Sequence, residues 1–395
     1  MSTRAEIKLV SALVVLSGAA CATQPAPPAL PRADSTRVAQ LARDARYEYR
    51  WYAAGPWAVH TVTVRPTACG VGFRTSKARS RMIGREQTSV LARRASASLT
   101  VIAAINGDFF SFDPPGVSEG PQIADGVLLK SEGHHREALE DRRLRRQSVF
   151  AVDGEGWPRV LHTRMHGSVR AGNFTVPLAG VNVRPRSDSA FVYTAFWGDS
   201  TPADSAALEL ILRGGVIARV DTSASGVEIP ADGAVVAVRG AARARVGGLA
   251  MGDSVFWTAD FEGVPAAREM IGGYPMLLLH GKPVFQDEVG LRSAFSERRH
   301  PRAAIGIDRR GRVHIVAVDG RQPAHSDGMT LQEFSDFLTA YGITDALNLD
   351  GGGSTTLWTV GHIANRPSDS NGERAVSNAL LVIDQAQAAV CTGKR

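Results

Sequence analysis

The pattern of apolar and polar residues predicts strands along most of the chain. Residues 57–66 (WAVHTVTVRP) alternate between the two classes, which is typical of a half-buried strand. Residues 99–110 (LTVIAAINGDFF) contain an unbroken apolar run that stops at Asn106, which predicts a fully buried strand followed by a turn. Between about residues 150 and 262, short apolar runs alternate with Gly, Asp and Pro turns and predict a β-rich segment. Before all of these, residues 35–47 are expected to be helical.

The last third of the chain has the pattern of strand, loop, helix and strand. Residues 313–321 (VHIVAVDGR) and 343–350 (ITDALNLD) are the two strands. Between them, Thr330 and Glu333 have the T-x-x-E spacing of a capping box, and Gly342 ends the helix. Such a crossover normally pairs its strands in parallel. We therefore predict a mixed α/β (α+β) fold, with this C-terminal strand-helix-strand crossover unit in a central sheet and a β-rich middle segment.

Three consecutive glycines follow the second of these strands, directly after Asp350. Because side chains alternate along a strand, Asn348 and Asp350 share one face, and the leucines between them anchor the other. Glycine allows positive φ angles and close approach of a ligand, and successive backbone amides form a receptor for an oxyanion. This pattern favours a binding site over a tight turn with a capping serine. The residues expected to bind the oxyanion are Gly351, Gly352, Gly353, Ser354 and Thr355.

An acidic residue beside glycine ends three of the predicted strands, at Asp108, Asp319 and Asp350. Parallel pairing in the crossover should make Asp319 and Asp350 neighbours at one sheet edge. Carboxylates gathered there repel one another unless they hold a cation, share a proton or take part in acid–base chemistry. Arg302 and Arg321 occur in the same part of the chain, and arginine suits phosphate because it offers paired hydrogen bonds.

Composition limits the class of protein and its partners. The chain has 395 residues, of which 44% are hydrophobic and 21% charged, so it is long enough for two or three lobes with substantial cores. The net charge of +6 is spread along the chain. Its one dense patch, residues 136–146, also contains acidic residues and is expected to be a solvated face and no nucleic-acid site. No C-x-x-C, H-E-x-x-H or EF-hand motif occurs, so the sequence requires no cofactor, although three carboxylates could hold Ca²⁺.

The first residues predict export. Two basic residues precede an apolar run that is too short to span a bilayer, and small residues and Cys21 end the run. Residues 1–21 thus resemble a bacterial lipoprotein signal, in which Cys21 would carry the lipid that anchors the protein to a membrane, in the periplasm or at the cell surface. Gly18 stands where leucine is more usual, so an ordinary secretory signal and a soluble secreted protein are the alternative.

The rest of the chain is expected to consist of a tether and a folded domain. Residues 22–35 are rich in proline and alanine and too poor in large apolar groups to fold. The domain is expected over residues 36–390. An oxidising compartment would permit a disulfide between Cys69 and Cys391, which the sequence leaves open.

Six motifs together resemble the phosphodiester glycosidase domain family. They are NGDFF at residue 106, GGYPMLLLHGKPV at 272, RHPRAAIGID at 299, VAVDGR at 316, SDGMTLQEFSDFL at 326 and DALNLDGGGSTT at 345. The resemblance covers about residues 50–385, and its last motif is the most specific. It implies hydrolysis of a sugar that is linked through its anomeric carbon to a phosphate diester. Ala303 departs from the family pattern, which has Thr or Ser after the arginine of the HPR motif, and this departure bears on specificity.

Residue chemistry and the resemblance together assign roles. Asp350 or Asp319 is expected to be the nucleophile or the base for water, and Asp108 the acid or a residue that orients the sugar. Asn106, Arg302 and Arg321, with the loop from residue 351 to 355, are expected to bind the substrate and its phosphate.

Two other functions remain open from the sequence. A non-catalytic lipoprotein could use the same cleft to bind a glycan or another anionic polymer. The D-G-G-G-S-T stretch also resembles the phosphate loops of actin-like phosphatases and ATPases, but the export signal and the lack of a second such loop disfavour that function. The substrates expected for an exported hydrolase are sugar phosphodiesters of the cell envelope or of extracellular glycans.

Overall fold

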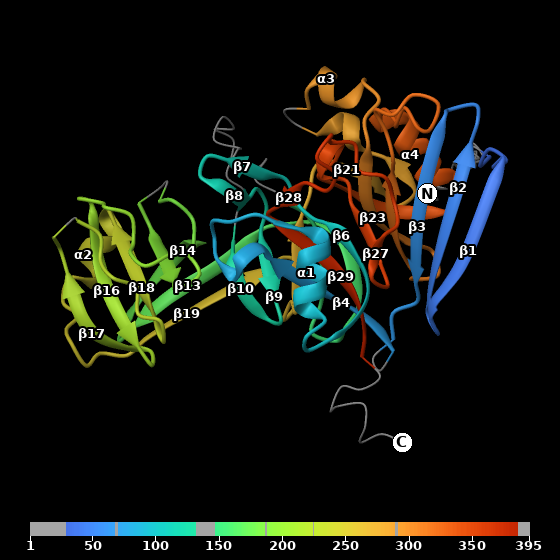
Figure 1. Cartoon of the computed structure of the whole chain (residues 1–395). Helices are drawn as coiled ribbons and strands as arrows, with labels where there is room; N and C mark the ends of the chain where they lie inside the picture. Colours follow the sequence, from blue (N-terminus) through green and yellow to red (C-terminus); the bar gives the residue numbers. More distant parts are fainter. Residues whose placement is uncertain are drawn as a thin grey trace, which may run out of the picture.

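Antiparallel sheets make up most of the structure, a computed structural model that describes residues 29–67, 70–131, 147–185, 188–223, 225–288 and 291–385. Within these residues four sheets have five or more strands, and the four α-helices contain only four to ten residues each (Figure 1). The predicted mixed α/β fold is therefore wrong, because strands follow one another along most of the chain without helices between them.

The C-terminal strand-helix-strand segment does not form the predicted parallel pair. β24 (Val313–Val318) and β25 (Ile343–Leu349) are separated by β23 (Arg302–Asp308), which pairs antiparallel with both. The prediction failed because the intervening strand comes from earlier in the chain, and the spacing of the other two does not reveal it. Since β24 and β25 both run opposite to β23, their C-terminal ends still reach the same sheet edge, one strand apart.

The largest sheet has eight strands and two buried faces. On one face α4 (Leu331–Ala340) covers the sheet through Phe334 and Leu338, which pack against Val316 and Ala346. In spatial order the strands of this sheet are β1 (Ser35–Ala42), β2 (Ala45–Tyr52), β3 (Trp57–Val64), β24, β23, β25, β21 (Met276–Leu279) and β22 (Lys282–Pro283).

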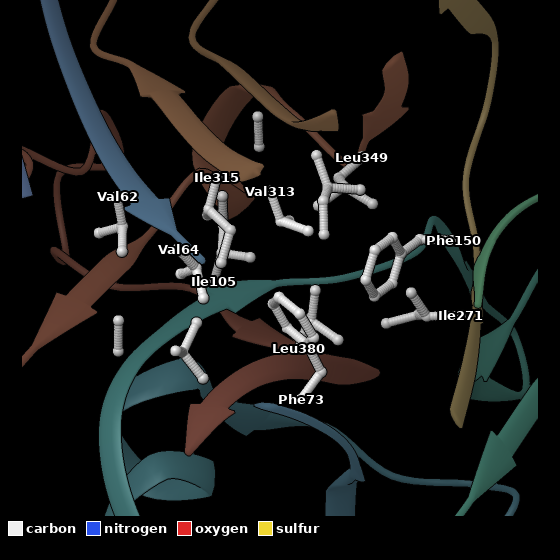
Figure 2. Packing of buried hydrophobic residues seen from close by; sticks show 14 of the residues in the cluster. Val62, Val64, Phe73, Ile105, Phe150, Ile271, Val313, Ile315, Leu349 and Leu380 are labelled. Atoms are coloured by element: carbon white, nitrogen blue, oxygen red, sulfur yellow. The ribbon is translucent and has the colours of Figure 1, made fainter. Parts of the chain in front are cut away.

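Two five-stranded sheets share a core with the other face of the eight-stranded sheet. Figure 2 shows this core, to which the large sheet contributes Val62 and Ile315 and the two smaller sheets contribute Ile105, Leu380 and Phe150. The strand that brings the N-G-D turn to this core is β6, which is almost wholly buried, as its unbroken apolar run predicts. One small sheet contains β27 (His362–Ile363), β26 (Leu357–Thr359), β6 (Thr100–Asn106), β29 (Asn378–Asp384) and β4 (Val71–Lys77). The other contains β10 (Val127–Lys130), β9 (Gln122–Ala124), β20 (Glu269–Gly272), β11 (Gln147–Val152) and β12 (Pro158–Thr163).

Most of the segment expected to be rich in strands forms a separate lobe, seen in green and yellow at the left of Figure 1. A bridge between Val216 and Ser254 joins the two outermost strands, so the sheet curls around its own apolar core. The lobe contains β17 (Val216–Asp221), β16 (Ala207–Arg213), β18 (Gly233–Arg239), β15 (Ala190–Thr194), β14 (Phe174–Val181), β13 (Met165–Ala171) and β19 (Val255–Phe261). Only β14 and β15 pair in parallel among these strands.

Two local predictions near the ends of the fold had opposite outcomes. The helix expected over residues 35–47 is wrong, because β1 and β2 pair with each other there, and cross-strand contacts outweigh a weak helical pattern. The capping box of α4 is confirmed: Glu333 N donates to Thr330 Oγ1 at 3.0 Å, and Thr330 N donates to Glu333 Oε2 at 2.9 Å. Gly342 follows the helix with a φ of +95°.

The remaining elements are short. They are α1 (Thr88–Ala95), α2 (Ala241–Val246), α3 (Ser293–Ser296), the pair β5 (Glu86–Gln87) and β28 (Ala375–Val376), the pair β7 (Phe110–Phe112) and β8 (Pro115–Ser118), and the 3₁₀ turns Ala78–Ser80, Phe285–Asp287 and Gly352–Ser354.

Candidate active site

The C-terminal end of β25 meets the C-terminal end of β6, so two segments far apart in the sequence form one site. Asp350 N donates to Gly107 O at 2.9 Å, and Asn106 Nδ2 donates to Asp350 O at 2.6 Å. Asn106 Oδ1 accepts from Thr356 N at 3.0 Å. The fully buried Asn106 side chain therefore uses both its polar atoms to join the strands, which favours a role in positioning over the predicted role in substrate binding.

Asp350 is half-buried and lies directly after β25, where this strand meets β6. Burial raises the pKa of Asp350 to about 6, although the Ser354 hydroxyl, Arg374 and the Gly351 amide each lower it. A carboxyl group with this pKa is mostly ionised at pH 7 but is held less tightly in the charged form than an exposed aspartate. Asp350 is therefore suited to act as a base or a nucleophile.

Asp108 lies just beyond the turn that receives Asp350, and it is buried. Its Oδ2 accepts from Gly120 N at 2.5 Å, and its own backbone N–H donates to Asn378 Oδ1 at 2.9 Å. Burial raises the pKa of Asp108 to about 7, against the effect of the Gly120 amide. A side chain on Gly272 would lie only 2.7 Å from Asp108 Oδ2, so glycine is needed at residue 272 for this close packing.

Asp319 is buried and fully hydrogen-bonded. Its Oδ2 accepts from His325 Nε2 at 2.8 Å and lies 3.3 Å from His60 Nε2. Its Oδ1 accepts from Asn365 Nδ2 at 3.1 Å and from Arg366 N at 2.9 Å. Burial opposes ionisation, but the hydrogen bonds from the two histidines and the Arg366 amide hold the pKa of Asp319 below its usual value. With both oxygens engaged, Asp319 is better suited to positioning than to nucleophilic attack.

Most backbone amides of the glycine loop donate hydrogen bonds to carbonyl groups of the protein. Gly352 N donates to Pro301 O at 2.9 Å, Ser354 N to Gly351 O at 3.1 Å and Thr355 N to Gly352 O at 3.2 Å. These amides are therefore not available to form the predicted oxyanion receptor. Glycine is nevertheless required, since Gly352 has a φ of +59° and a side chain on Gly351 would lie 2.8 Å from Pro301 O.

The two predicted arginines differ in their surroundings. Arg302 is buried and donates from Nε to Met329 O at 2.8 Å and from Nη2 to Phe295 O at 2.8 Å. Burial, with Arg321 nearby, lowers its pKa to about 10. Arg321 is exposed and forms no ion pair within the part of the chain that the structure describes. Arg302 therefore builds the wall of the site, whereas Arg321 is free to contact a ligand.

His300 lies between these arginines as a neutral imidazole. Arg321 Nη2 can only donate, so His300 Nδ1 accepts at 3.2 Å, and the ring proton lies on Nε2, which donates to Ala294 O at 3.3 Å. Burial and the neighbouring Arg302 and Arg321 lower the pKa of His300. The imidazole thus orients Arg321 without adding charge of its own.

Several contributors to the site were missed by sequence reasoning. Arg374 forms a two-point ion pair with Asp369, with Nε to Oδ2 at 2.8 Å and Nη2 to Oδ1 at 3.0 Å. Asn365 and Asn378 hold Asp319 and the turn before Asp108. The sequence gives only a weak signal for Asp369 and Arg374, because an Asp and an Arg on either side of an N-G turn are common on protein surfaces.

Ala303, the departure from the family pattern, is fully buried in the core shared by the sheets. Its neighbours across the strands are Ala317 and Leu349, which belong to the same apolar cluster. Ala303 therefore does not leave a gap in the substrate-facing surface.

Other predictions concern metals, membranes and residues beyond the described part of the chain. Among the described residues, no three His, Cys, Asp or Glu side chains form a group that could hold a metal ion, so Asp108, Asp319 and Asp350 do not gather into the Ca²⁺ site considered above. In the same residues no helix has the length and apolar character needed to span a membrane. Cys21, Cys69, Cys391 and the patch at residues 136–146 lie outside the described residues.

The fold and the site define an antiparallel β-sheet protein with two perturbed carboxyl groups beside arginines suited to an anionic ligand. The phosphodiester glycosidase family model matches residues 206–383, which include β23, β25, the glycine loop and Arg374. This match confirms the predicted resemblance over that part of the chain.

Individual relatives match less of the chain. The Bos taurus N-acetylglucosamine-1-phosphodiester alpha-N-acetylglucosaminidase is 38% identical over 82 residues, which cover 21% of this chain and 15% of that protein. The match thus spans less than a sixth of that relative's length. Two solved structures share the fold: a hypothetical protein from Synechocystis, with a TM-score of 0.72 at 23% identity over 91% of this chain and 64% of that one, and a candidate exported protein from Burkholderia pseudomallei K96243, with a TM-score of 0.64 at 21% identity over 83% and 74%.

Proposed function

We propose that the protein hydrolyses the glycosidic bond of a sugar-1-phosphodiester. The observation that carries this proposal is the hydrogen bond from Asp350 N to Gly107 O, which joins the two segments that carry the carboxyl groups with raised pKa values, Asp350 and Asp108. Arg321 lies against the glycine loop that follows Asp350. Glycoside cleavage commonly uses two carboxyl groups, one as a carboxylate and the other as an acid. The arginines favour a substrate whose leaving group carries negative charge. The activity in the name of the Bos taurus relative, N-acetylglucosamine-1-phosphodiester alpha-N-acetylglucosaminidase, agrees with this reaction.

In the proposed reaction, Asp350 acts as the carboxylate and Asp108 as the acid or the group that orients the sugar. Asp350 either attacks the anomeric carbon, to form a glycosyl ester that water then hydrolyses, or takes a proton from the water that attacks this carbon directly. The bond between the anomeric carbon and the phosphate oxygen breaks, and its electron pair leaves on the phosphomonoester. That leaving group has a second pKa of about 6, so it needs charge stabilisation more than protonation. Arg321 is placed to supply this stabilisation.

The decisive experiment identifies the bond that is cleaved. The protein is incubated with a sugar-1-phosphodiester in ¹⁸O-water, with and without EDTA, and the label is located by mass spectrometry. Label in the released sugar is expected for a glycosidase. Label in the phosphate would mean phosphodiesterase chemistry and would overturn the proposal. Retention of the glycan without release of any product would favour the non-catalytic binding function instead.

Substitutions at the carboxyl groups separate the roles of the aspartates. Asp350→Asn is expected to abolish turnover while leaving the thermal unfolding curve near that of the wild type, because asparagine keeps the shape but cannot attack or take the proton. Asp108→Asn should reduce kcat by about 100-fold or more. Wild-type kcat in the Asp350→Asn variant would exclude Asp350 as the reactive carboxylate.

We further infer that the protein is exported and anchored through lipid on Cys21, with residues 22–35 as a tether and a domain over residues 36–390. The support is the charge and length pattern of residues 1–21, together with the description of the similar Burkholderia pseudomallei protein as a candidate exported protein. Substrates in the cell envelope or in extracellular glycans follow from that location.

Cys21→Ser is expected to move the protein from the membrane to the soluble fraction, as judged by fractionation and lipid labelling. Equal membrane retention of both forms would disprove the anchor.

A further inference from the structure

Two guanidinium groups from different loops lie against the consecutive glycines after Asp350. A side chain on Gly352 would lie 3.0 Å from Arg321 Nη2 and 3.3 Å from Nη1. A side chain on Gly353 would overlap Arg374 Nη2 and Asp369 Oδ1. The glycines are therefore needed less for their amides than for the close approach of two arginines to the backbone beside Asp350.

Arg374 is held in place by its own ion pair and by the contacts of the residue next to it in the chain. Asp369 binds it through two hydrogen bonds, at 2.8 and 3.0 Å, which fix the plane of the guanidinium. The adjacent Glu373 binds Ser89 N at 2.7 Å and Ser89 Oγ at 2.6 Å at the start of α1. The segment that carries Arg374 is thus tied to a helix, and the guanidinium has little freedom to move away from the loop.

Both arginines retain hydrogen-bond donors for a ligand. Asp369 occupies Nε and Nη2 of Arg374, and no acceptor within the described residues is bound to Nη1. Arg321 has a hydrogen bond only to His300, through Nη2, in the same part of the structure. Among the described residues Arg321 forms no ion pair with a carboxylate, and its hydrogen-bond partner His300 is neutral.

We propose that Arg321 and Arg374 form a two-arginine clamp that binds the non-bridging oxygens of the substrate's phosphate, with Asp369 as the residue that positions Arg374. The phosphate group of a diester presents two such oxygens, and two planar donors approaching from different loops match them better than one cation would. The clamp replaces the backbone-amide receptor that the glycine sequence suggested. The inference rests on the proposed function only in its choice of a phosphate diester as the anion.

The test measures binding without turnover. Dimethyl phosphate serves as the probe, because it is a stable diester with no glycosidic bond, and its affinity is read from broadening of its ³¹P resonance. We expect Arg374→Gln and Arg321→Gln each to weaken binding by about 10-fold or more, as for the loss of a charge-assisted contact. The matched control is Arg213→Gln, which removes an exposed arginine that pairs with Asp232 at 2.8 Å in the separate lobe.

Further variants keep the inference testable if Arg374→Gln is poorly folded. Asp369→Asn leaves the arginine in place but loosens it, and should weaken binding by a smaller factor. Arg374→Lys should retain part of the affinity, because charge remains and the fork is lost. Wild-type affinity in folded Arg374→Gln, or no broadening of the probe by the wild type, would overturn the clamp. Binding that needs Arg374 without any hydrolysis of a sugar phosphodiester would instead overturn only the proposed function.

Discussion

At the scale of single residues, the proposed chemistry depends on two carboxyl groups, Asp350 and Asp108, whose pKa values are raised by burial. Asp350 must be ionised to react, and its pKa is about 6. Asp108 must keep its proton to act as an acid, and its pKa is about 7. Activity should therefore rise as pH increases through about 6 and fall above about 7. A profile of kcat/KM between pH 4 and pH 9, a range that brackets both pKa values, measures the rise and the fall of activity.

Arg374 provides an independent test of the acid limb of the pH profile, which we assign to the ionisation of Asp350. Its positive charge lowers the pKa of Asp350, so Arg374→Gln should raise that pKa and shift the acid limb of the profile upward. The limb that belongs to Asp108 should stay in place. A variant with lower affinity but an unchanged acid limb would show that Arg374 contacts the ligand without influencing Asp350.

Asp319 is expected to stabilise the fold in its ionised form. Because its folded pKa is lowered, its contribution to the free energy of unfolding is present above the unfolded pKa and is lost as pH falls through the folded value. Asp319→Asn should cost about 1–3 kcal/mol at pH 7, since the amide NH₂ would replace the oxygen that accepts from the buried His60 and the partly buried His325. Urea unfolding at pH 7 and at pH 3 measures the difference, which should shrink at the lower pH. An equal cost at both values would argue against an ionised Asp319.

The sequence singles out the two residues that we propose to be reactive but does not fix their roles. Asp350 and Asp108 stand out because each follows a strand and adjoins glycine. The raised pKa of Asp108 could not be predicted, because its carboxyl group is enclosed by Gly272 of β20, which is distant in sequence, and by the loop at Gly120. Asp319 has the same local signature as Asp350, yet His60 and Asn365 from distant segments and His325 from the following loop bind its oxygens. Pattern alone does not distinguish these two environments.

At the scale of elements, the glycine loop should be sensitive to a single added methyl group. In Gly353→Ala the methyl would overlap Asp369 and Arg374 and displace their ion pair, so we expect kcat/KM to fall by about 10-fold and the free energy of unfolding to fall by about 1–3 kcal/mol. Gly248→Ala is the control, because nothing lies within 4 Å of the added methyl there. Steady-state kinetics and chemical denaturation of both variants measure the changes in kcat/KM and in the free energy of unfolding. Wild-type kinetics in Gly353→Ala would show that the arginine tolerates displacement.

Local patterns predicted individual elements but not their partners. β3 and β6 follow from alternation and from an unbroken apolar run, and the capping box fixed the start of α4. The pairing of β23 between β24 and β25 could not be predicted, because antiparallel insertion of an earlier strand leaves the strand-helix-strand pattern unchanged. The wrong pairing arose from the assumption that a helix between two strands implies a parallel pair, and the error in fold class arose because one such segment does not represent a chain that is mostly antiparallel strands.

At the scale of the whole molecule, the positive charge should govern the approach of an anionic substrate. The formal net charge is +6, and Arg321 lies exposed with no ion pair among the described residues. Charges at a protein surface act over about 30 Å at 0.01 M salt but only about 8 Å at 0.15 M. The KM for a sugar-1-phosphodiester should therefore rise as sodium chloride increases over this range, with kcat nearly constant, because salt weakens capture and leaves the chemical step inside the site unchanged.

The same measurement separates the site from the general charge of the surface. Arg321→Gln should flatten the dependence of KM on salt as well as raise KM, whereas Arg213→Gln removes an equal charge from the separate lobe and should leave the slope unchanged. If both variants flattened the slope equally, the net charge alone would account for capture, and Arg321 would have no special place in it. A slope that responds only to Arg321 would locate substrate capture at the loop that carries Asp350, where the two small sheets meet the large one.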